Sequence, residues 1–133
     1  MKRRTLEFSS HAANLALMRN FLRGFLDDFP LSERDRTLIV LGVDEACTNI
    51  IRHAYKLRED QPIALSCEGR ADCVRLRLRD YGEQPQADRL RERKRDIIRP
   101  GGLGLIMIRN AFDKIDYVLR QRGTELVLTK KLG

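Results

Sequence analysis

The 133-residue sequence predicts a two-layer α+β sandwich, in which a mainly antiparallel, mixed sheet carries helices on one face. Segments with strand and helical periodicity follow one another in the order β, α, α, β, β, loop, α, β, β. Two pairs of neighbouring strands are separated by short turns, which favours antiparallel hairpins. The length suits one hydrophobic core, so we expect residues 1–133 to form a single domain.

The first part of the chain predicts a strand followed by two helices. TLEF at 5–8 is typical of a short strand, and Ser9 and Ser10 are candidate N-caps for the next helix. The sequence from Ser32 to Asp35 resembles a capping signal, so a second helix is expected from about Glu33 to about Leu57. Five apolar residues with helical spacing define the buried face of the first helix: Leu15, Met18, Leu22, Phe25 and Phe29.

The second part predicts two hairpins on either side of a charged segment and a helix. IALSC at 63–67 and VRLRLR at 74–79 flank the turn EGRAD, and alternating arginines predict one solvent-facing side. Residues 82–100 are mostly charged and bounded by glycine and proline, which indicates a surface segment. A helix is expected from the following glycines to about Phe112. Strands at 116–121 and 125–132, joined by Arg122 and Gly123, complete the fold.

The composition restricts the classes of function. A net charge of +7 favours an anionic partner, which could be a nucleotide, a nucleic acid or an acidic protein surface. The aromatic residues are not clustered and no recognition motif is present, which argues against direct nucleic-acid binding. Because no apolar run approaches the ~20 residues of a membrane span, we expect a cytoplasmic protein without membrane contact. Three cysteines without a CxxC pair indicate neither a disulfide framework nor a zinc site.

A polar stripe runs along the second predicted helix. Glu45, Asn49 and His53 are spaced four residues apart, so they lie on one helical face. A solvated face is the simpler interpretation, yet no lysine stands at the next turn to form the usual surface ion pairs. A carboxylate can accept a proton, and an amide oxygen can ligate magnesium.

Two short motifs follow this helix in the sequence. Asp80-Tyr81-Gly82 ends the second strand of the first hairpin, and such a sequence is ordinarily a turn. The glycines of GGLGL at 101–105 could also form a plain loop, but free backbone amides at a helix start suit phosphate groups. Neither GxxxxGK[ST] nor GxGxxG after a strand is present, so a nucleotide site would need a different fold.

Taken together, VDEACTNIIRHAY at 43–55, DYG at 80–82 and GGLGL at 101–105 resemble the nucleotide-binding boxes of the Bergerat-fold (GHKL, histidine-kinase-like) ATPases. Among these, the sequence is most similar to the small anti-sigma factor serine kinases. The resemblance spans nearly the whole chain. It implies an anti-sigma factor with ATP-dependent protein serine kinase activity, which sequesters a sigma factor and phosphorylates an anti-anti-sigma (STAS-type) protein. The alternative is a non-catalytic module of the same fold that sequesters a regulatory protein in a nucleotide-dependent way.

The resemblance also implies roles for individual residues. Glu45 matches the general base, and Asn49 matches the asparagine that holds Mg²⁺ at the ATP phosphates. Asp80 matches the aspartate that accepts a hydrogen bond from the adenine amino group. Arg19 matches an arginine turned toward protein partners, although a surface arginine is the simpler interpretation. The other positions implied in nucleotide binding are Gly82, Gly102, Leu103, Gly104, Leu105 and Thr124.

The segment at about 83–100 corresponds in this resemblance to an ATP lid. Where the family commonly has a second glycine, this chain has Gln84 followed by Pro85, which is expected to alter how the lid hinges. His53 could contact phosphate or pack, and packing or ending the helix is the favoured interpretation. Because members of the family commonly pair, a homodimer is a further expectation.

Overall fold

The computed structural model describes residues 1–85 and 103–133, with side chains given from residue 106 in the second range. The described residues form five strands, three α-helices and one π-helix. In chain order they are β1 (Lys2–Ser9), α1 (Asn14–Leu26), α2 (Glu33–Asn49), the π-helix η1 (Ile50–Ala54), β2 (Pro62–Gly69), β3 (Cys73–Asp80), α4 (Leu103–Ala111), β4 (Lys114–Leu119) and β5 (Thr124–Lys131).

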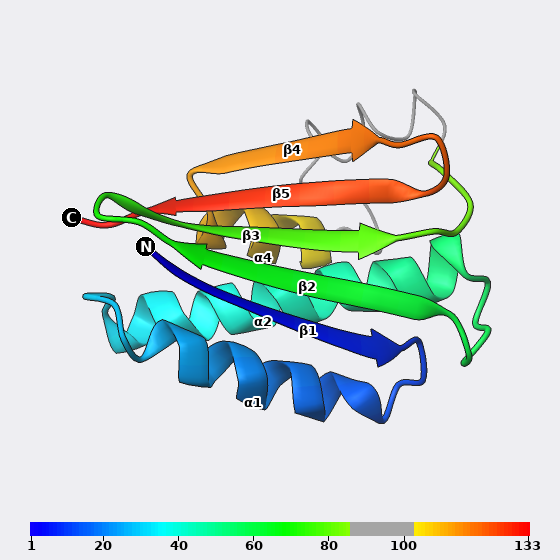
Figure 1. The fold of residues 1–133 in the computed structure, drawn as a ribbon, viewed down its shortest axis with the longest axis horizontal. Coiled ribbons are helices and arrows are strands. Elements are labelled where there is room, and N and C mark those ends of the chain that lie inside the picture. The colour runs from blue at the N-terminus through cyan, green and yellow to red at the C-terminus, as the bar shows by residue number, and fades with distance from the viewer. Residues whose placement is uncertain (86–102) are drawn as a thin grey trace.

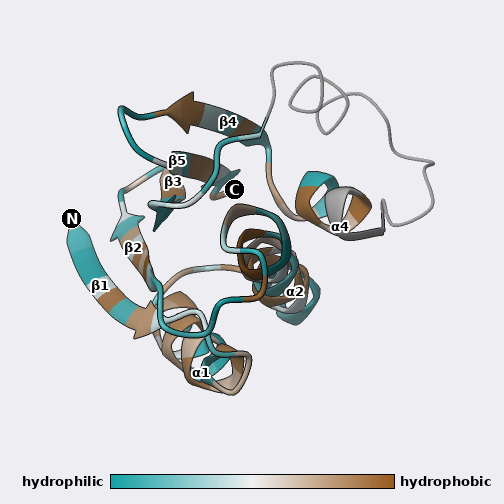
Figure 2. Cartoon of the chain, turned by 90° about the vertical axis from the view of Figure 1, so that its right-hand side faces the viewer, coloured by the Kyte–Doolittle hydropathy of each residue, from teal (hydrophilic) through white to brown (hydrophobic). Residues whose placement is uncertain are grey.

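The strands form one sheet in the order β1-β2-β3-β5-β4, and the helices cover one face of it (Figures 1 and 2). This arrangement confirms the predicted two-layer α+β architecture. All four pairings between the described strands are antiparallel. We expected a mixed sheet, but no parallel pair is present among these strands. Short turns join β2 to β3 and β4 to β5, and α1 and α2 lie between β1 and β2 in the chain. After α4 the chain forms the edge strand β4, and β5 returns to pair between β4 and β3.

The core lies between the sheet and the helices. Alternation in β3 places Leu76 and Leu78 in the core, at most 1% exposed, while Arg77 and Arg79 lie on the opposite face and are half-buried. The predicted face of α1 is confirmed for Met18, Leu22 and Phe25. Phe29 lies beyond the helix end and packs against Phe25, with ring centroids 5.0 Å apart.

The predicted cap of α2 is confirmed, whereas the predicted caps of α1 are wrong. Ser32 Oγ accepts a hydrogen bond from Asp35 N at 3.0 Å. The N-cap of α1 is Ala13, without a side-chain hydrogen bond. Ser10 lies too early for capping; its hydroxyl accepts from Gln61 N at 3.1 Å and donates to Arg58 O. The serine therefore ties the end of β1 to the loop before β2.

The second helix differs from the expected Glu33–Leu57 helix at its end. The α-helix ends at Asn49 and continues as η1, where Tyr55 N donates to Ile50 O at 2.9 Å. Two residues in the left-handed region, Lys56 (φ 51°) and Leu57 (φ 66°), then reverse the chain. A π-turn spaces its hydrogen bonds five residues apart, and hydrophobic periodicity does not distinguish it from an α-turn.

Other element boundaries shift by a few residues. β1 is longer than the predicted TLEF strand, and the first hairpin turn is confined to 70–72. The last hairpin is joined by 120–123, and α4 ends one residue before Phe112. Of the predicted lid, residues 86–100 lie outside the described residues. Among the described helices, none is long and apolar enough to cross a membrane.

Candidate functional site

A cavity of about 240 Å³ opens between the helical layer and the ends of β3, β5 and β4. This volume is close to the lower end of the ~300–1,000 Å³ typical of ligand pockets. Asn49, Asp80 and Thr124, three of the predicted site residues, line the cavity. Its apolar wall comes from both layers and consists of Ala46, Ile50, Ala54, Leu78, Ile108 and Leu126.

Asp80 and Thr124 lie directly opposite each other on the paired strands β3 and β5. Both are almost fully buried, with 4% and 6% of their surfaces exposed. Asp80 Oδ1 accepts a hydrogen bond from Gly82 N at 3.0 Å. Thr124 Oγ1 is buried without a hydrogen-bond partner among the described residues. Because an unpaired buried hydroxyl costs free energy, its presence on the cavity wall favours a polar ligand there.

Gly82 lies where the chain passes over the end of η1. A Cβ atom at this position would lie 2.5 Å from Ala54 O, and Glu83 N donates to the same oxygen at 2.8 Å. The family resemblance implied that Gly82 allows a nucleotide base to approach the backbone closely. The structure gives a second reason, which is the close approach of the backbone to the helix end.

Asn49 and Glu45 stand one turn apart on α2, and both are half-buried. Asn49 lines the cavity, whereas Glu45 is not among its lining residues. Neither side chain makes a hydrogen bond or ion pair with another described residue. An amide oxygen suits magnesium, which usually keeps water and phosphate oxygens as its other ligands, so Asn49 fits the expected role.

His53 lines the cavity and is exposed, so it does not pack in the core, and it lies in the last turn of η1, where the helix was expected to end. It belongs to η1, where the wider π-turn keeps residues 49 and 53 on the same side. Lys56, just after η1, lines the cavity as well, and its ammonium lies 3.8 Å from the Glu83 carboxylate.

Tyr55, for which the sequence predicted no role, links the end of η1 to β2 and to the residue after β3. Its side chain is fully buried. Its hydroxyl donates to Pro62 O at 2.5 Å and accepts from Tyr81 N at 2.8 Å. Burial raises the pKa of Tyr55 above its ordinary value, which keeps the donating hydroxyl protonated. The only sequence signal was an aromatic residue next to a predicted helix end.

The turn between β4 and β5 packs on the strand end that carries Asp80. Gly123 has a φ of 78°, and a Cβ atom there would lie 2.0 Å from Asp80 O. Gln84 Nε2 donates to Arg120 O at 2.6 Å and to Gly123 O at 2.7 Å. The residue that replaces the family's glycine therefore fastens the start of the predicted lid segment to this turn.

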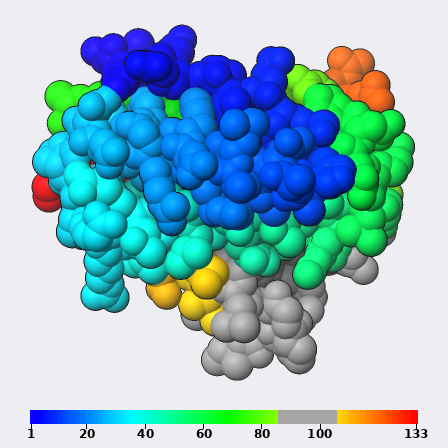
Figure 3. Space-filling model, turned by 90° about the horizontal axis from the view of Figure 1, so that it is seen from below, coloured from blue at the N-terminus to red at the C-terminus, as the bar shows by residue number. Residues whose placement is uncertain are grey.

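The other predicted site residues lie outside the described residues, at the start of α4, or on α1. Gly102 lies outside the described residues. Leu103, Gly104 and Leu105 form the beginning of α4, so a helix does start at the glycine-rich stretch. Arg19 pairs with Asp44 of α2, with 2.8 Å between Nη1 and Oδ1. This pair lies in the helical layer, which Figure 3 shows from below as one continuous surface.

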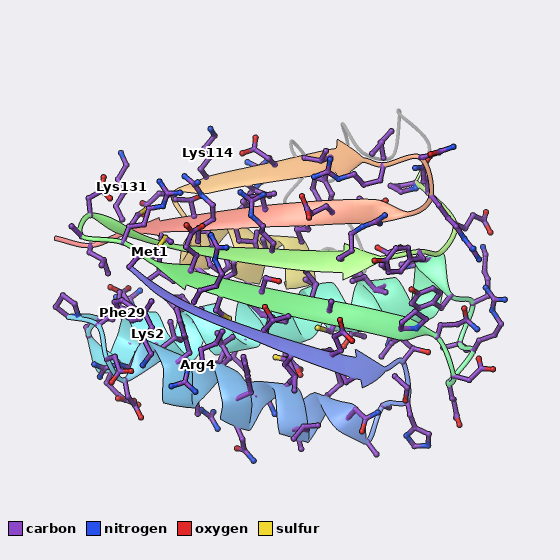
Figure 4. The ribbon with its side chains drawn as sticks, in the orientation of Figure 1. Met1, Lys2, Arg4, Phe29, Lys114 and Lys131 are labelled. Atoms are coloured by element: carbon purple, nitrogen blue, oxygen red, sulfur yellow. The ribbon has the colours of Figure 1, made fainter. Side chains whose placement is uncertain are left out.

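Four basic residues lie away from the cavity. Lys2, Arg4, Lys114 and Lys131 lie at the opposite end of the sheet, near both chain termini (Figure 4). Lys2 pairs with Asp28, and Lys114 Nζ lies 3.7 Å from Asp116.

The three cysteines are buried and free, and burial raises the pKa of Cys67 to about 12. These groups are not part of the cavity.

Residues 8–130 match the model of the histidine kinase-like ATPase domain, and the chain belongs to this family.

Among curated relatives, an anti-sigma F factor of Oceanobacillus iheyensis is 26% identical over 97% of this chain and 92% of its own length. A serine-protein kinase RsbW of Halalkalibacterium halodurans is 32% identical over 71% of this chain and 61% of its own. The crystal structure of the RsbU and RsbW domains of a Mycobacterium tuberculosis protein aligns with a TM-score of 0.69 at 18% identity. That alignment covers 99% of this chain and 33% of the other, and it confirms the fold.

Proposed function

We propose that this chain is an anti-sigma factor with ATP-dependent protein serine kinase activity, which acts in the cytoplasm, sequesters a sigma factor and phosphorylates a STAS-type anti-anti-sigma protein. One observation carries the proposal. It is the buried hydroxyl of Thr124, unpartnered among the described residues, beside the Asp80 carboxylate on the cavity wall. The family and the names of the relatives support ATP as the ligand and serine as the acceptor.

The strand ends supply recognition of the adenine base. Asp80 accepts a hydrogen bond from the exocyclic amino group, and the Thr124 hydroxyl makes a second polar contact. Leu78, Ile108 and Leu126 offer apolar surface to the ring. Backbone amides at the start of α4 bind the phosphates, because the first N–H groups of a helix have no partner within it. The residues we assign to this contact are Gly102, Leu103, Gly104 and Leu105.

The α2 side supplies the chemistry. Asn49 holds Mg²⁺, which when bound neutralises phosphate charge. Glu45 accepts the proton of the acceptor serine while the bond from Oγ to the γ-phosphorus forms. The bond from that phosphorus to the bridging oxygen breaks, and ADP leaves. The protein's contribution is therefore positioning and proton removal.

The protein partners bind the helical layer in this proposal. Arg19 is held by Asp44 in the free chain and contacts a partner carboxylate in the complex. Pairing of two copies, which is common in the family, is also part of the proposal.

One observation favours the alternative of a non-catalytic module. Glu45 does not line the cavity, although it would have to reach the acceptor hydroxyl. A module without transfer would hold ATP or ADP only as a conformational ligand while it sequesters a regulatory protein.

Incubation with γ-labelled ATP, Mg²⁺ and candidate STAS-type proteins distinguishes the two functions. We expect a labelled phosphoserine on one candidate, and no label when that acceptor serine is replaced by alanine. A chain that binds ATP and a sigma factor but never yields phosphoserine would be the non-catalytic module. A well-folded chain that binds neither ATP nor ADP in calorimetry would rule out both.

A further inference from the structure

We propose that Arg79 is a positioning residue of the nucleotide site, although its side chain lies on the sheet face away from the cavity. The inference deepens the proposed function and rests on it, because it requires that a nucleotide base binds beside Asp80 and Thr124. Arg79 itself touches neither the cavity nor a ligand. It acts through the strand ends that carry the two recognition side chains.

The guanidinium of Arg79 is bound to three backbone carbonyls. Nη2 donates to Arg122 O at 2.8 Å, and Nη1 donates to Asp80 O and, at 3.4 Å, to Thr124 O. The guanidinium carbon also lies 4.1 Å from the centroid of the Tyr81 ring. Only a planar group with several fixed donors can hold carbonyls from two strands and stack on an aromatic ring at once.

Two of these carbonyls belong to Asp80 and Thr124, the residues that form the base-recognition pair, and the third belongs to the turn before Thr124. Asp80 is the last residue of β3 and Thr124 is the first residue of β5, so beyond them no ladder hydrogen bond holds the two strands together. Strand ends fray unless other contacts hold them. Arg79 supplies those contacts from behind the sheet, with charge-assisted hydrogen bonds that are stronger than neutral ones.

Gln84 holds the same turn from the other side. Its amide donates to Arg120 O and Gly123 O, whereas Arg79 donates to Arg122 O and Thr124 O. Side chains from two segments therefore bind four carbonyls within five consecutive residues. The same turn packs closely against Asp80. There is no room for a side chain at Gly123, because its Cβ atom would collide with the carbonyl oxygen of Asp80. The backbone that carries the Asp80 carboxylate and the Thr124 hydroxyl is thus held by Arg79 from the face away from the cavity and by Gln84 from the cavity side.

The test compares Arg79→Met with Arg77→Met, a matched control on the same strand and face. Arg77 lies 3.5 Å from Glu125 and makes no hydrogen bond to the carbonyls of residues 120–124. We expect Arg79→Met to weaken ATP binding about 10-fold in calorimetry, the effect of losing one or two charge-assisted hydrogen bonds. Arg77→Met should change it less than about 2-fold. The ratio of ATP to GTP affinity should fall in Arg79→Met, because a general loss of stability would weaken both nucleotides alike. Arg79→Lys should recover part of the ATP affinity.

Amide hydrogen exchange on the nucleotide-free chain provides the second measurement. Residues 120–124 and 80–84 should exchange about 10-fold faster in Arg79→Met than in Arg77→Met, with the centre of β3 unchanged. If both variants show the same exchange and the same ATP-to-GTP ratio, the inference is wrong. Neither measurement depends on phosphoserine formation. A chain that binds ATP without transferring phosphate would therefore contradict the proposed kinase activity, but the role of Arg79 could still be tested.

Discussion

The two sides of the cavity are built differently. On the strand side, Asp80 and Thr124 stand on backbone that is held by Arg79, Gln84 and Tyr55. On the helix side, Glu45 and Asn49 have no hydrogen bond or ion pair with other described residues. Groups that recognise a constant part of a ligand benefit from being fixed in advance. The hydrogen bonds of a proton-accepting group often form only once the substrate is bound. The contrast supports the proposal that the strands recognise the nucleotide and that α2 carries the chemistry.

The largest effect should come from the helix side. Glu45→Gln keeps the size of the side chain but removes the proton acceptor, so we expect phosphate transfer to fall about 10²- to 10⁴-fold. ATP affinity measured by calorimetry should stay within about 3-fold, because recognition lies on the strands. The control is Glu33→Gln, at the exposed start of the same helix. Normal transfer by Glu45→Gln would show that another group is the base and would break the proposed division of roles.

A second test concerns the turn that rests on Asp80. Gly123→Ala would place a Cβ atom 2.0 Å from Asp80 O in a left-handed residue, so we expect the free energy of unfolding to fall by about 3 kcal/mol. Gly24→Ala is the matched control: no atom lies within 4 Å and the residue is inside α1, so a gain of about 0.5–1 kcal/mol is expected. Chemical denaturation measures both. Equal effects would mean that the strand side is not held as tightly as the contacts imply.

These contacts also mark the limit of what could be predicted from the sequence. Periodicity located every described strand and α-helix. Two of the ordered motifs pointed to Asn49 and Asp80, and the family resemblance pointed to Thr124; all three line one cavity. The hydrogen bonds of Gln84 were not predictable, because its partners lie 36 and 39 residues away in a turn with no distinctive pattern. Ser10 failed as a cap for the same reason, since its hydroxyl bonds to residues about fifty positions along the chain. Periodicity placed the elements, whereas contacts between residues distant in the sequence were not predictable from local signals.

The third prediction removes one hydroxyl from the strand side. Tyr55→Phe leaves Tyr81 N and Pro62 O without their buried partner, so the free energy of unfolding should fall by about 1–3 kcal/mol. Tyr81→Phe is the control, because Tyr81 is 41% exposed and its ring can still stack on Arg79. A Tyr55→Phe variant as stable as Tyr81→Phe would show that water replaces the hydroxyl and that the link between η1 and β3 is weak.

The smallest expected effect tests whether the helix side retains backbone strain. Leu57 follows η1 with a φ of 66°, a conformation that costs a side-chain-bearing residue about 1–2 kcal/mol. Its side chain is 66% exposed, so replacement by glycine removes little packing. We therefore expect Leu57→Gly to raise the free energy of unfolding by about 1 kcal/mol, whereas glycine at exposed Leu17 inside α1 should lower it by a similar amount. If Leu57→Gly also leaves ATP affinity unchanged, the strain at the helix exit is not needed for binding. A loss of affinity with the gain in stability would instead show that the strained exit positions His53 and Lys56 at the cavity.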